Sequence, residues 1–365
     1  MDEHEVCRHT PRRNFRVASL GDALVWAGMI VRDTYCWTNP YVNGWIHRFY
    51  GTHCRDLYGT RVFTEAHFRE LLARDEQPEY MLKWCFDSDR AAMVSICREL
   101  GINVAFGEDG FFPHYSAVHV DPLGFCWESS LTRMVFRGIT DRQRERARTL
   151  RAQWLTVPDK ELPPSVKSPY VFWPLQLVHD QVNEWDLRVK DWSGLLRHFR
   201  AALPVEFQLV LKQHPVGKDK DVVGLADLLK QIPNTILLPK ETHLPTLLRH
   251  SWAVAGANSS VLYEARLIHH KPTYCYARSW FTNHSELFVP VVRNDKRPLP
   301  RLDWLEDPKR MRTPWLDDYT DWFLAQLLSR QYSQKEADRQ PADFKKRIAQ
   351  LSWHSYREHG EAIFD

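Results

Sequence analysis

Hydrophobic and polar positions divide the second half of the chain into short apolar runs separated by segments with helical spacing. Apolar runs at 170–175, 207–211, 235–238, 252–255 and 273–276 predict strands. Segments at 191–202, 222–231, 243–250 and 259–268 repeat apolar residues every three or four positions and predict the intervening helices. Apolar strands that alternate with helices are typical of a parallel sheet covered on both faces.

The first half shows the same alternation less completely. A helix is predicted over 90–100 and a strand over 102–106, with a turn at 107–110 after it. A basic helix over 140–156 precedes a proline-rich linker at 162–169. We therefore predict an α/β fold with two Rossmann-like domains that face a cleft, at residues 1–165 and 166–316. Helices within 317–365 are expected to pack back on the first domain.

Composition narrows the functional classes. The 49 basic and 46 acidic residues are too balanced to indicate nucleic-acid binding. Seven scattered cysteines without a CxxC pair favour a reducing compartment over a disulfide framework or a zinc site. The polar N-terminus resembles no signal peptide, and no run of roughly 18 apolar residues predicts a spanning helix. We therefore expect a cytoplasmic protein.

Arginines cluster at 142–151 and again at 310–312. Such clusters are usually solvated helix faces. The alternative is a patch for anionic lipid headgroups or a charged glycan, which leaves peripheral association with the inner face of the membrane open.

Two predicted strand ends carry residues suited to a nucleotide. Lys212, His214 and Pro215 follow the strand at 207–211, where open α/β sheets place their ligands. After the strand at 252–255, the chain turns into a helix whose first positions include small polar residues. Backbone N–H groups and hydroxyls at a helix start suit a phosphate, and a glutamate farther along could accept from ribose hydroxyls. These residues are Asn258, Ser259, Ser260 and Glu264.

Carboxylates are predicted on both sides of the expected cleft. Glu108 and Asp109 lie on the turn after the strand at 102–106, and Asp180 follows the first strand of the second domain. Two opposed carboxylates suit glycosyl transfer, one as acid/base and one as nucleophile. By contrast, Asp121-Pro122 is more typical of a turn than of a catalytic group. The chain has no DxD or HExxH motif, so no metal is expected.

Taken in order, these motifs resemble a known family. Glu108-Asp109-Gly110, His214-Pro215 and Ser259-Ser260 resemble the acidic-Gly, His-Pro and Ser/Thr motifs of bacterial CMP-sugar transferases of the GT-B fold, which include sialyltransferases and β-Kdo transferases. The segments 108–113, 120–124, 174–176 with 180–181, and 257–265 look like the retaining β-Kdo transferases of the KpsC and WbbB type. The resemblance spans roughly residues 100–280.

The resemblance implies a role for each matching residue. Asp180 would be the nucleophile at C2 of Kdo, and Glu108, with Asp109 beside it, would exchange a proton with the acceptor hydroxyl. The remaining matches would bind the donor: the phosphate contacts His214, Ser259 and Ser260, the ribose contact Glu264, and their neighbours Gln176, Lys212, Pro215 and Asn258. Around Asp180 the chain has His179-Asp180-Gln181, where the capsule enzymes are expected to have Asp-Ser-Gln.

The expected function is transfer of Kdo from CMP-β-Kdo to a saccharide acceptor, a lipid-linked glycan of capsule or lipopolysaccharide O-antigen synthesis. Retention through a covalent Kdo-enzyme intermediate would give a β-linked product. Two alternatives stay open: an inverting CMP-sialic acid transferase with Glu108 or Asp109 as general base, and an inactive module that binds a nucleotide sugar or glycan.

Overall fold

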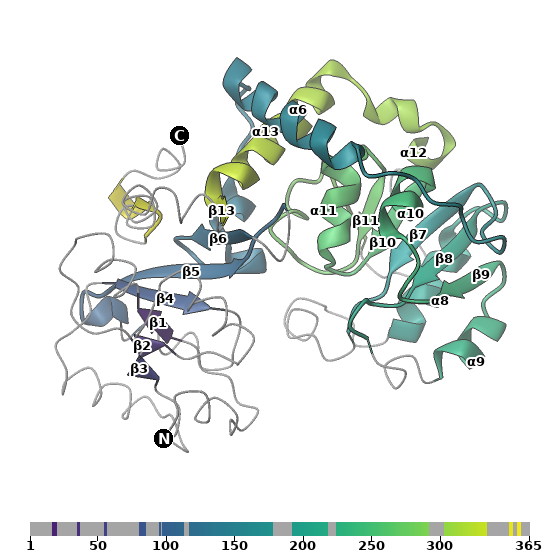
Figure 1. Ribbon diagram of the computed structural model, residues 1–365, viewed down its shortest axis with the longest axis horizontal. Helices are drawn as coiled ribbons and strands as arrows, with labels where there is room; N and C mark the ends of the chain where they lie inside the picture. Colours follow the sequence, from purple (N-terminus) through teal and green to yellow (C-terminus); the bar gives the residue numbers. More distant parts are fainter. Residues whose placement is uncertain are drawn as a thin grey trace. The chain divides into compact units, whose positions relative to one another are not determined.

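The computed structural model describes residues 17–19, 35–36, 55–56, 80–84, 95, 97–112, 117–177, 192–217, 224–291, 303–333, 350–352 and 356–358. Contacts within the chain define two compact units. The first contains Met1–Ser130 together with Leu327–Asp365, and the second contains Leu131–Gln326. Figure 1 traces both along the chain.

The second unit is built around a six-stranded sheet (Figure 1). All neighbouring strands in it are parallel. Its order is β12 (Val289–Pro290), β11 (Thr273–Cys275), β10 (Ala253–Gly256), β7 (Tyr170–Pro174), β8 (Gln208–Lys212) and β9 (Thr235–Leu238). The prediction of strands from five apolar runs is confirmed within one or two residues at each end. Only β12, which has two residues, lacked a detectable pattern.

Chain order reverses in the middle of this sheet. From β7 the chain proceeds to β8 and β9 on one side, and then crosses to β10 on the other side of β7. The carboxyl ends of β7 and β10 therefore form a topological switch point, where connections leave in opposite directions and open α/β sheets bind their ligands.

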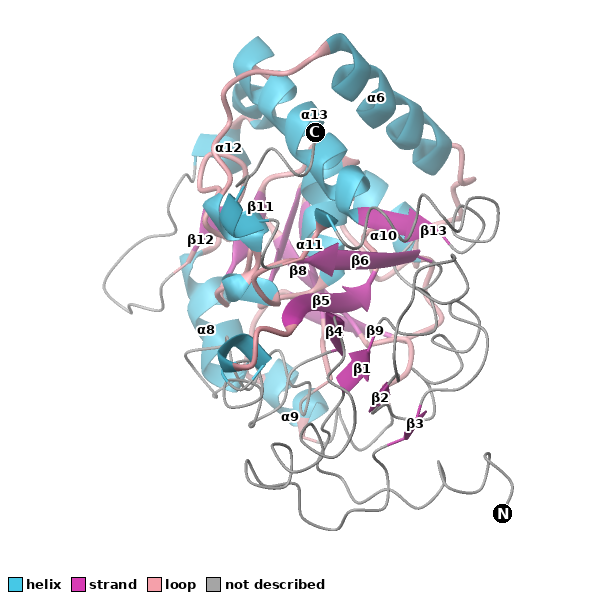
Figure 2. Ribbon diagram, turned by 90° about the vertical axis from the view of Figure 1, so that its left-hand side faces the viewer, coloured by secondary structure: helices cyan, strands magenta, loops and turns pink. Residues whose placement is uncertain are grey.

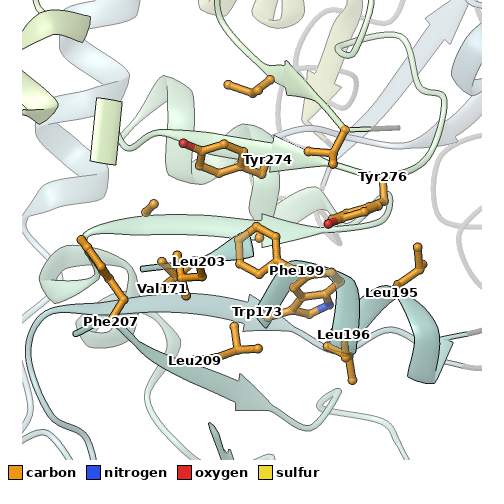
Figure 3. Packing of buried hydrophobic residues seen from close by; sticks show 14 of the residues in the cluster. Val171, Trp173, Leu195, Leu196, Phe199, Leu203, Phe207, Leu209, Tyr274 and Tyr276 are labelled. Carbon is orange, nitrogen blue, oxygen red and sulfur yellow. The ribbon is translucent and has the colours of Figure 1, made fainter. Parts of the chain in front are cut away.

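Helices cover both faces of the sheet, because the central strands carry apolar side chains on both of those faces. Every residue of β7, β8 and β10 is buried. Alternate strand residues such as Trp173 and Leu209 pack with Leu195 and Phe199 of α8 (Trp192–Ala202) in one cluster, shown in Figure 3. Removing a large side chain of this kind from water stabilises the fold by about 1.5–3 kcal/mol.

On the opposite face, the Tyr170 hydroxyl donates to the Leu247 carbonyl of α10 (Leu244–His250) at 2.8 Å. The remaining helices of the sheet region are α9 (Leu225–Lys230), α11 (Ser260–Leu267), α12 (Asp303–Glu306) and the 3-10 turn η4 (Pro308–Met311).

Two longer helices complete the second unit. The helix α6 (Asp141–Leu155) begins with a capping box, in which Thr140 and Gln143 each accept from the other's backbone N–H. Arg144 and Arg151 of α6 form ion pairs with α13 (Pro314–Arg330), at 3.1 Å to Asp318 and 2.8 Å to Asp321, and the helices lie side by side in Figures 1 and 2.

The two compact units divide the chain at other positions than the domain boundaries expected at 165 and 316. Both α6 and most of α13 group with the parallel sheet, and the division falls at Ser130 and at Gln326 instead. The predicted helix at 342–358 lies mostly outside the described residues, of which only 350 and 356–358 are helical there.

The first unit contains a five-stranded sheet, visible in Figure 2. Its order is β1 (Val17–Ser19), β4 (Tyr80–Trp84), β5 (Asn103–Asp109), β6 (Ala117–Asp121) and β13 (Gln331–Ser333). Only β4 and β5 are parallel. The short strands β2 (Tyr35–Cys36) and β3 (Arg55–Asp56) pair separately.

A buried aspartate organises the loop after β6. Asp121, which is fully buried, accepts from the backbone N–H groups of Leu123, Gly124 and Ser130 and from the hydroxyls of Ser129 and Ser130, at 2.6–3.1 Å. This loop continues into the 3-10 turns η1 (Cys126–Glu128) and η2 (Ser130–Arg133). The prediction that Asp121 serves turn structure is confirmed, because its oxygens are occupied by the loop itself.

Among the described helices, none combines the length and apolar character needed to cross a membrane.

Candidate nucleotide-sugar site

The candidate site lies at the switch point of the parallel sheet, where one hydrogen bond joins the segments after β7 and β10. The side chain of Gln176, two residues past the end of β7, accepts from the backbone N–H of Asn258 at 2.9 Å. Asn258 in turn lies two residues past β10. Both residues were predicted for the site from the sequence, and the structure brings them together.

The segment after β10 turns directly into α11. Ser259 is the N-cap, and its hydroxyl accepts from the Val261 N–H at 3.3 Å. Gly256 permits this turn to pack closely, because a Cβ there would lie 3.3 Å from Cδ2 of Leu262. Asn258, Ser259 and Ser260 are half-buried, so they are partly open to solvent at the start of the helix. The positive end of the helix dipole makes this position suitable for an anion.

The end of β8 supplies the predicted His214, which occupies a tight turn. Its carbonyl accepts from the Gly217 N–H at 2.9 Å, and its Nδ1 accepts from the Val216 N–H at 3.3 Å. A neutral imidazole whose Nδ1 accepts carries its proton on Nε2. His214 is half-buried and the following Pro215 is exposed. The ring is therefore oriented by its own loop, with Nε2 as a donor suited to a phosphate oxygen.

Lys212 has a different role from the one expected of a phosphate-binding cation. Its side chain is only 5% exposed, and its Nζ donates to the carbonyl oxygens of Lys240 at 2.8 Å and Gln213 at 3.3 Å. Burial lowers the pKa of the ammonium, an effect that the charge of Glu241 partly offsets. Lys212 thus joins the loops after β8 and β9, and its contribution to the site is to hold the turn that carries His214.

Glu264 lies one turn beyond Ser260 on α11, so the two side chains share a face of the helix. Its Oε1 accepts from the indole N–H of Trp154 on α6 at 2.9 Å. Desolvation raises the pKa of Glu264, and the Trp154 hydrogen bond opposes that rise. Glu264, the residue predicted to bind the ribose, is therefore held against α6 by Trp154. This hydrogen bond to Oε1 also fixes the direction of Oε2.

The expected acid/base residues lie in the first unit, and their local setting corrects one expectation. Glu108 and Asp109 were predicted on a turn, but both belong to β5, where they pair with His119 and Val118 of β6. The sequence could not show that an antiparallel partner extends the strand. The turn comes after them, at Gly110, where an added Cβ would lie 2.4 Å from Cβ of Ala117.

Glu108 is accompanied by a buried histidine. Its Oε2 lies 3.9 Å from Nε2 of His119, and the two side chains are 26% and 6% exposed. The His119 ring stacks on Phe111 with ring centroids 4.3 Å apart. Glu108 is therefore a partly exposed carboxylate beside a fixed imidazole, a setting that suits proton exchange. The predicted nucleophile, Asp180, and the side chain of Asp109 lie outside the described residues.

Three aromatic side chains that contact the elements of the candidate site were not predicted from the sequence. Trp173, at the end of β7, is fully buried, and its indole N–H has no hydrogen-bond partner among the described residues. Its ring packs against Tyr276, whose hydroxyl is 2.9 Å from Nδ1 of His198 on α8. Trp154 is the third, as the partner of Glu264. Aromatic residues are common in apolar cores, so no pattern in the sequence distinguished these from ordinary core positions.

Within the described ranges, no group of three or more His, Cys, Asp and Glu side chains is placed to hold a metal ion.

Residues 143–284 match the family model described as "Capsule polysaccharide biosynthesis protein". This range contains all predicted donor-binding residues and Asp180, but neither Glu108 nor Asp109. No match is found among curated proteins.

Solved structures similar to this chain include two of KpsC from Thermosulfurimonas dismutans. The "beta Kdo 2,7 transferase" has a TM-score of 0.54 at 18% identity, covering 84% of this chain and 97% of that one. The "beta Kdo 2,4 transferase" has a TM-score of 0.45 at 18% identity, covering 67% and 78%. The GT-B fold expected from the sequence is confirmed, and so is the resemblance to KpsC-type proteins. The chain is thus similar to KpsC in fold and, over residues 143–284, to the capsule polysaccharide biosynthesis family in sequence.

Proposed function

We propose that this protein is a glycosyltransferase of capsule or lipopolysaccharide O-antigen biosynthesis that transfers Kdo from CMP-β-Kdo to a saccharide acceptor with retention. The observation that carries the proposal is the Gln176–Asn258 hydrogen bond at the switch point, beside the start of α11. It holds a helix start, with its outward N–H groups, at the carboxyl edge of the sheet, beside residues that we propose bind the donor.

A CMP-sugar fits this helix start because it carries a single phosphate. The start of α11, the Ser260 hydroxyl and Nε2–H of His214 can together donate hydrogen bonds to one phosphodiester without a divalent cation. The ribose hydroxyls would donate to Glu264, one turn along the same face of α11. The proposal therefore includes no metal requirement.

The proposed reaction has two displacements. In the first, a carboxylate oxygen of Asp180 attacks C2 of Kdo while the bond from C2 to the phosphate oxygen breaks, and the electron pair leaves with CMP. In the second, the acceptor hydroxyl attacks C2 as Glu108 takes its proton, and the C2 bond to Asp180 breaks to restore the free carboxylate. Two inversions at C2 give net retention and a β-linked product. The acceptor would be a lipid-linked glycan at the cytoplasmic side of the membrane.

One incubation tests the proposal against its alternatives. The protein is mixed with CMP-Kdo or CMP-sialic acid, with and without a saccharide acceptor, and released CMP is measured. Acceptor-dependent CMP release from CMP-Kdo alone, with a β-linkage in the product by NMR, is the expected result.

Other outcomes would contradict it. Release from CMP-sialic acid with an inverted product would favour the inverting transferase, in which Asp180 has no covalent role. Binding of donor by calorimetry without turnover for any acceptor would favour the inactive binding module.

A further inference from the structure

We propose that the second unit docks on an anionic phospholipid surface through an apolar–basic patch formed by Val135 and Trp315 with Arg133 and Arg137. The patch joins the segment before α6 to the first turn of α13. The proposal goes beyond glycosyl transfer and does not depend on which donor or acceptor the protein uses.

The segment 133–137 alternates inward and outward side chains. Met134 is 7% exposed and Phe136 is half-buried, whereas Val135 is 65% exposed and both Arg133 and Arg137 are exposed. The valine therefore projects from the surface between two arginines. One exposed apolar side chain is ordinary on a protein surface, but an apolar side chain flanked by two exposed cations is the arrangement that an anionic lipid interface stabilises.

Trp315 stands beside this segment. It is 51% exposed at the start of α13, and its ring lies 5.9 Å from that of Phe136, the neighbour of Val135. Tryptophan favours the boundary between headgroups and acyl chains because its ring is apolar and its N–H is polar. Trp315 and Val135 thus both adjoin Phe136, the first through its ring and the second as its neighbour in the chain.

The support under the patch is rigid. The Phe136 ring stacks on Tyr319 with centroids 4.8 Å apart and an interplanar angle of 7°, and it also packs against Trp322. Tyr319 in turn is 2.8 Å from Nδ1 of His284 in the core. Such anchoring keeps Val135 and Trp315 in place before any contact with lipid, so docking requires little ordering of the chain.

Charge complementarity identifies the occupant as an anionic surface. In the segments 133–142 and 309–318, the basic residues are Arg133, Arg137, Arg142, Lys309, Arg310 and Arg312, and the acidic residues are Asp141, Asp317 and Asp318. Each of the three aspartates is in an ion pair with Arg144 or Arg312. Within the described part of the chain, no carboxylate pairs with Arg133 or Arg137. Their charges are therefore available to lipid phosphates.

The test is co-sedimentation of the full chain with vesicles of phosphatidylglycerol and phosphatidylcholine, compared with pure phosphatidylcholine. The protein should bind the anionic vesicles and lose binding as salt is raised. The double variant R133Q/R137Q should bind at least tenfold more weakly, since each cation near an anionic bilayer contributes roughly fivefold. Val135→Ser with Trp315→Ser should weaken binding to a similar extent but leave the salt dependence in place.

The matched control is Val205→Ser with Lys167→Gln, which removes an 83% exposed valine and an exposed cation elsewhere in the second unit. It should bind vesicles like the wild type. Thermal unfolding shows whether each variant folds, and R133Q/R137Q remains decisive if loss of Trp315 unfolds the protein. Transfer to a soluble acceptor should be unchanged in every variant, which separates this proposal from the proposed function. Equal vesicle binding by wild type and patch variants would overturn the proposal. So would loss of soluble-acceptor binding in the patch variants, which would identify a glycan site.

Discussion

The side chain of Gln176 accepts from the backbone N–H of Asn258 at 2.9 Å, across the point where the parallel sheet reverses its chain order. The two residues are 82 positions apart in the sequence. This bond joins the start of α11 to the loop after β7, in which Asp180 is expected.

Gln176→Ala should weaken CMP binding by about 2- to 12-fold, because an ordinary hydrogen bond contributes about 0.5–1.5 kcal/mol. Gln176→Glu keeps an acceptor for Asn258 but brings a negative charge toward the phosphate, so its affinity should fall further. Calorimetry with CMP measures both. The exposed Gln231, which accepts from Arg197, is a matched control, and its replacement by alanine should leave CMP affinity unchanged. If Gln176→Ala, Gln176→Glu and the Gln231 variant all bound CMP with equal affinity, the Gln176–Asn258 bond would have no role in CMP binding.

Lys212 and His214 are two residues apart but should respond differently to substitution. His214→Ala should weaken CMP binding by about 10- to 100-fold, as expected for a hydrogen bond to a charged group, with little loss of stability. Lys212→Met leaves the carbonyl of Lys240 without its donor and should lower the free energy of unfolding by about 1–3 kcal/mol. Urea unfolding and calorimetry on each variant check this contrast. If a Lys212 variant kept native stability but lost CMP affinity, Lys212 would be a phosphate-binding residue instead.

Asp180→Asn should abolish turnover, by about 10⁴-fold or more, because the proposed covalent intermediate requires an ionised carboxylate. CMP affinity should remain, since the residue contacts the sugar rather than the nucleotide. Intact-mass spectrometry of the Asp180→Cys variant mixed with donor should show the gain of one Kdo residue on the protein. Glu108→Gln should slow transfer of Kdo to the acceptor but should not prevent attachment of Kdo to the protein. An adduct that maps to a different carboxylate would falsify the assignment.

Glu264 should make the stability of the protein depend on pH. Burial raises the pKa of this carboxyl above its ordinary value of 4.5, so the folded state binds a proton that the unfolded state releases. The free energy of unfolding should therefore fall as pH rises from about 4.5 through the raised value.

Glu264→Gln removes this titration and keeps an acceptor for Trp154. The variant should have a flatter pH profile and be at least as stable as the wild type at neutral pH. Its CMP affinity should fall if the carboxylate binds the ribose. Thermal unfolding across the pH range gives the comparison, and identical profiles for the two proteins would contradict it.

Sequence patterns predicted the parallel sheet better than the mixed one. The strands β7, β8, β10 and β11 are buried throughout and β9 is half-buried, and all five appear as short apolar runs between helices. By contrast, β5 was predicted to end before Glu108. The strand extends farther because it pairs with β6, which no local pattern shows. The strands β12 and β13 are too short to carry a pattern. Local periodicity thus identifies elements stabilised by burial and misses those defined by a partner strand.

For the candidate site, the sequence identified residues but not their contacts. Gln176, Asn258 and His214 were predicted from strand ends, which the topology of the sheet determines. The partner of Glu264 is 110 residues away on a helix that the sequence assigned to the other domain. Ion pairs such as Arg151–Asp321, which join α6 to α13 from distant parts of the chain, are likewise contacts that no local pattern in the sequence shows.

The buried carboxylate of Asp121 has a consequence for how the first unit opens. Its two oxygens bind donors from positions 123, 124, 129 and 130, so no one of these groups can be released without disturbing the others. The loop should therefore unfold as one cooperative block, and the amides of Leu123, Gly124 and Ser130 should exchange their hydrogens for deuterium at a common slow rate. Since this loop begins where β6 ends, the same block protects the strand that pairs with Glu108 from fraying.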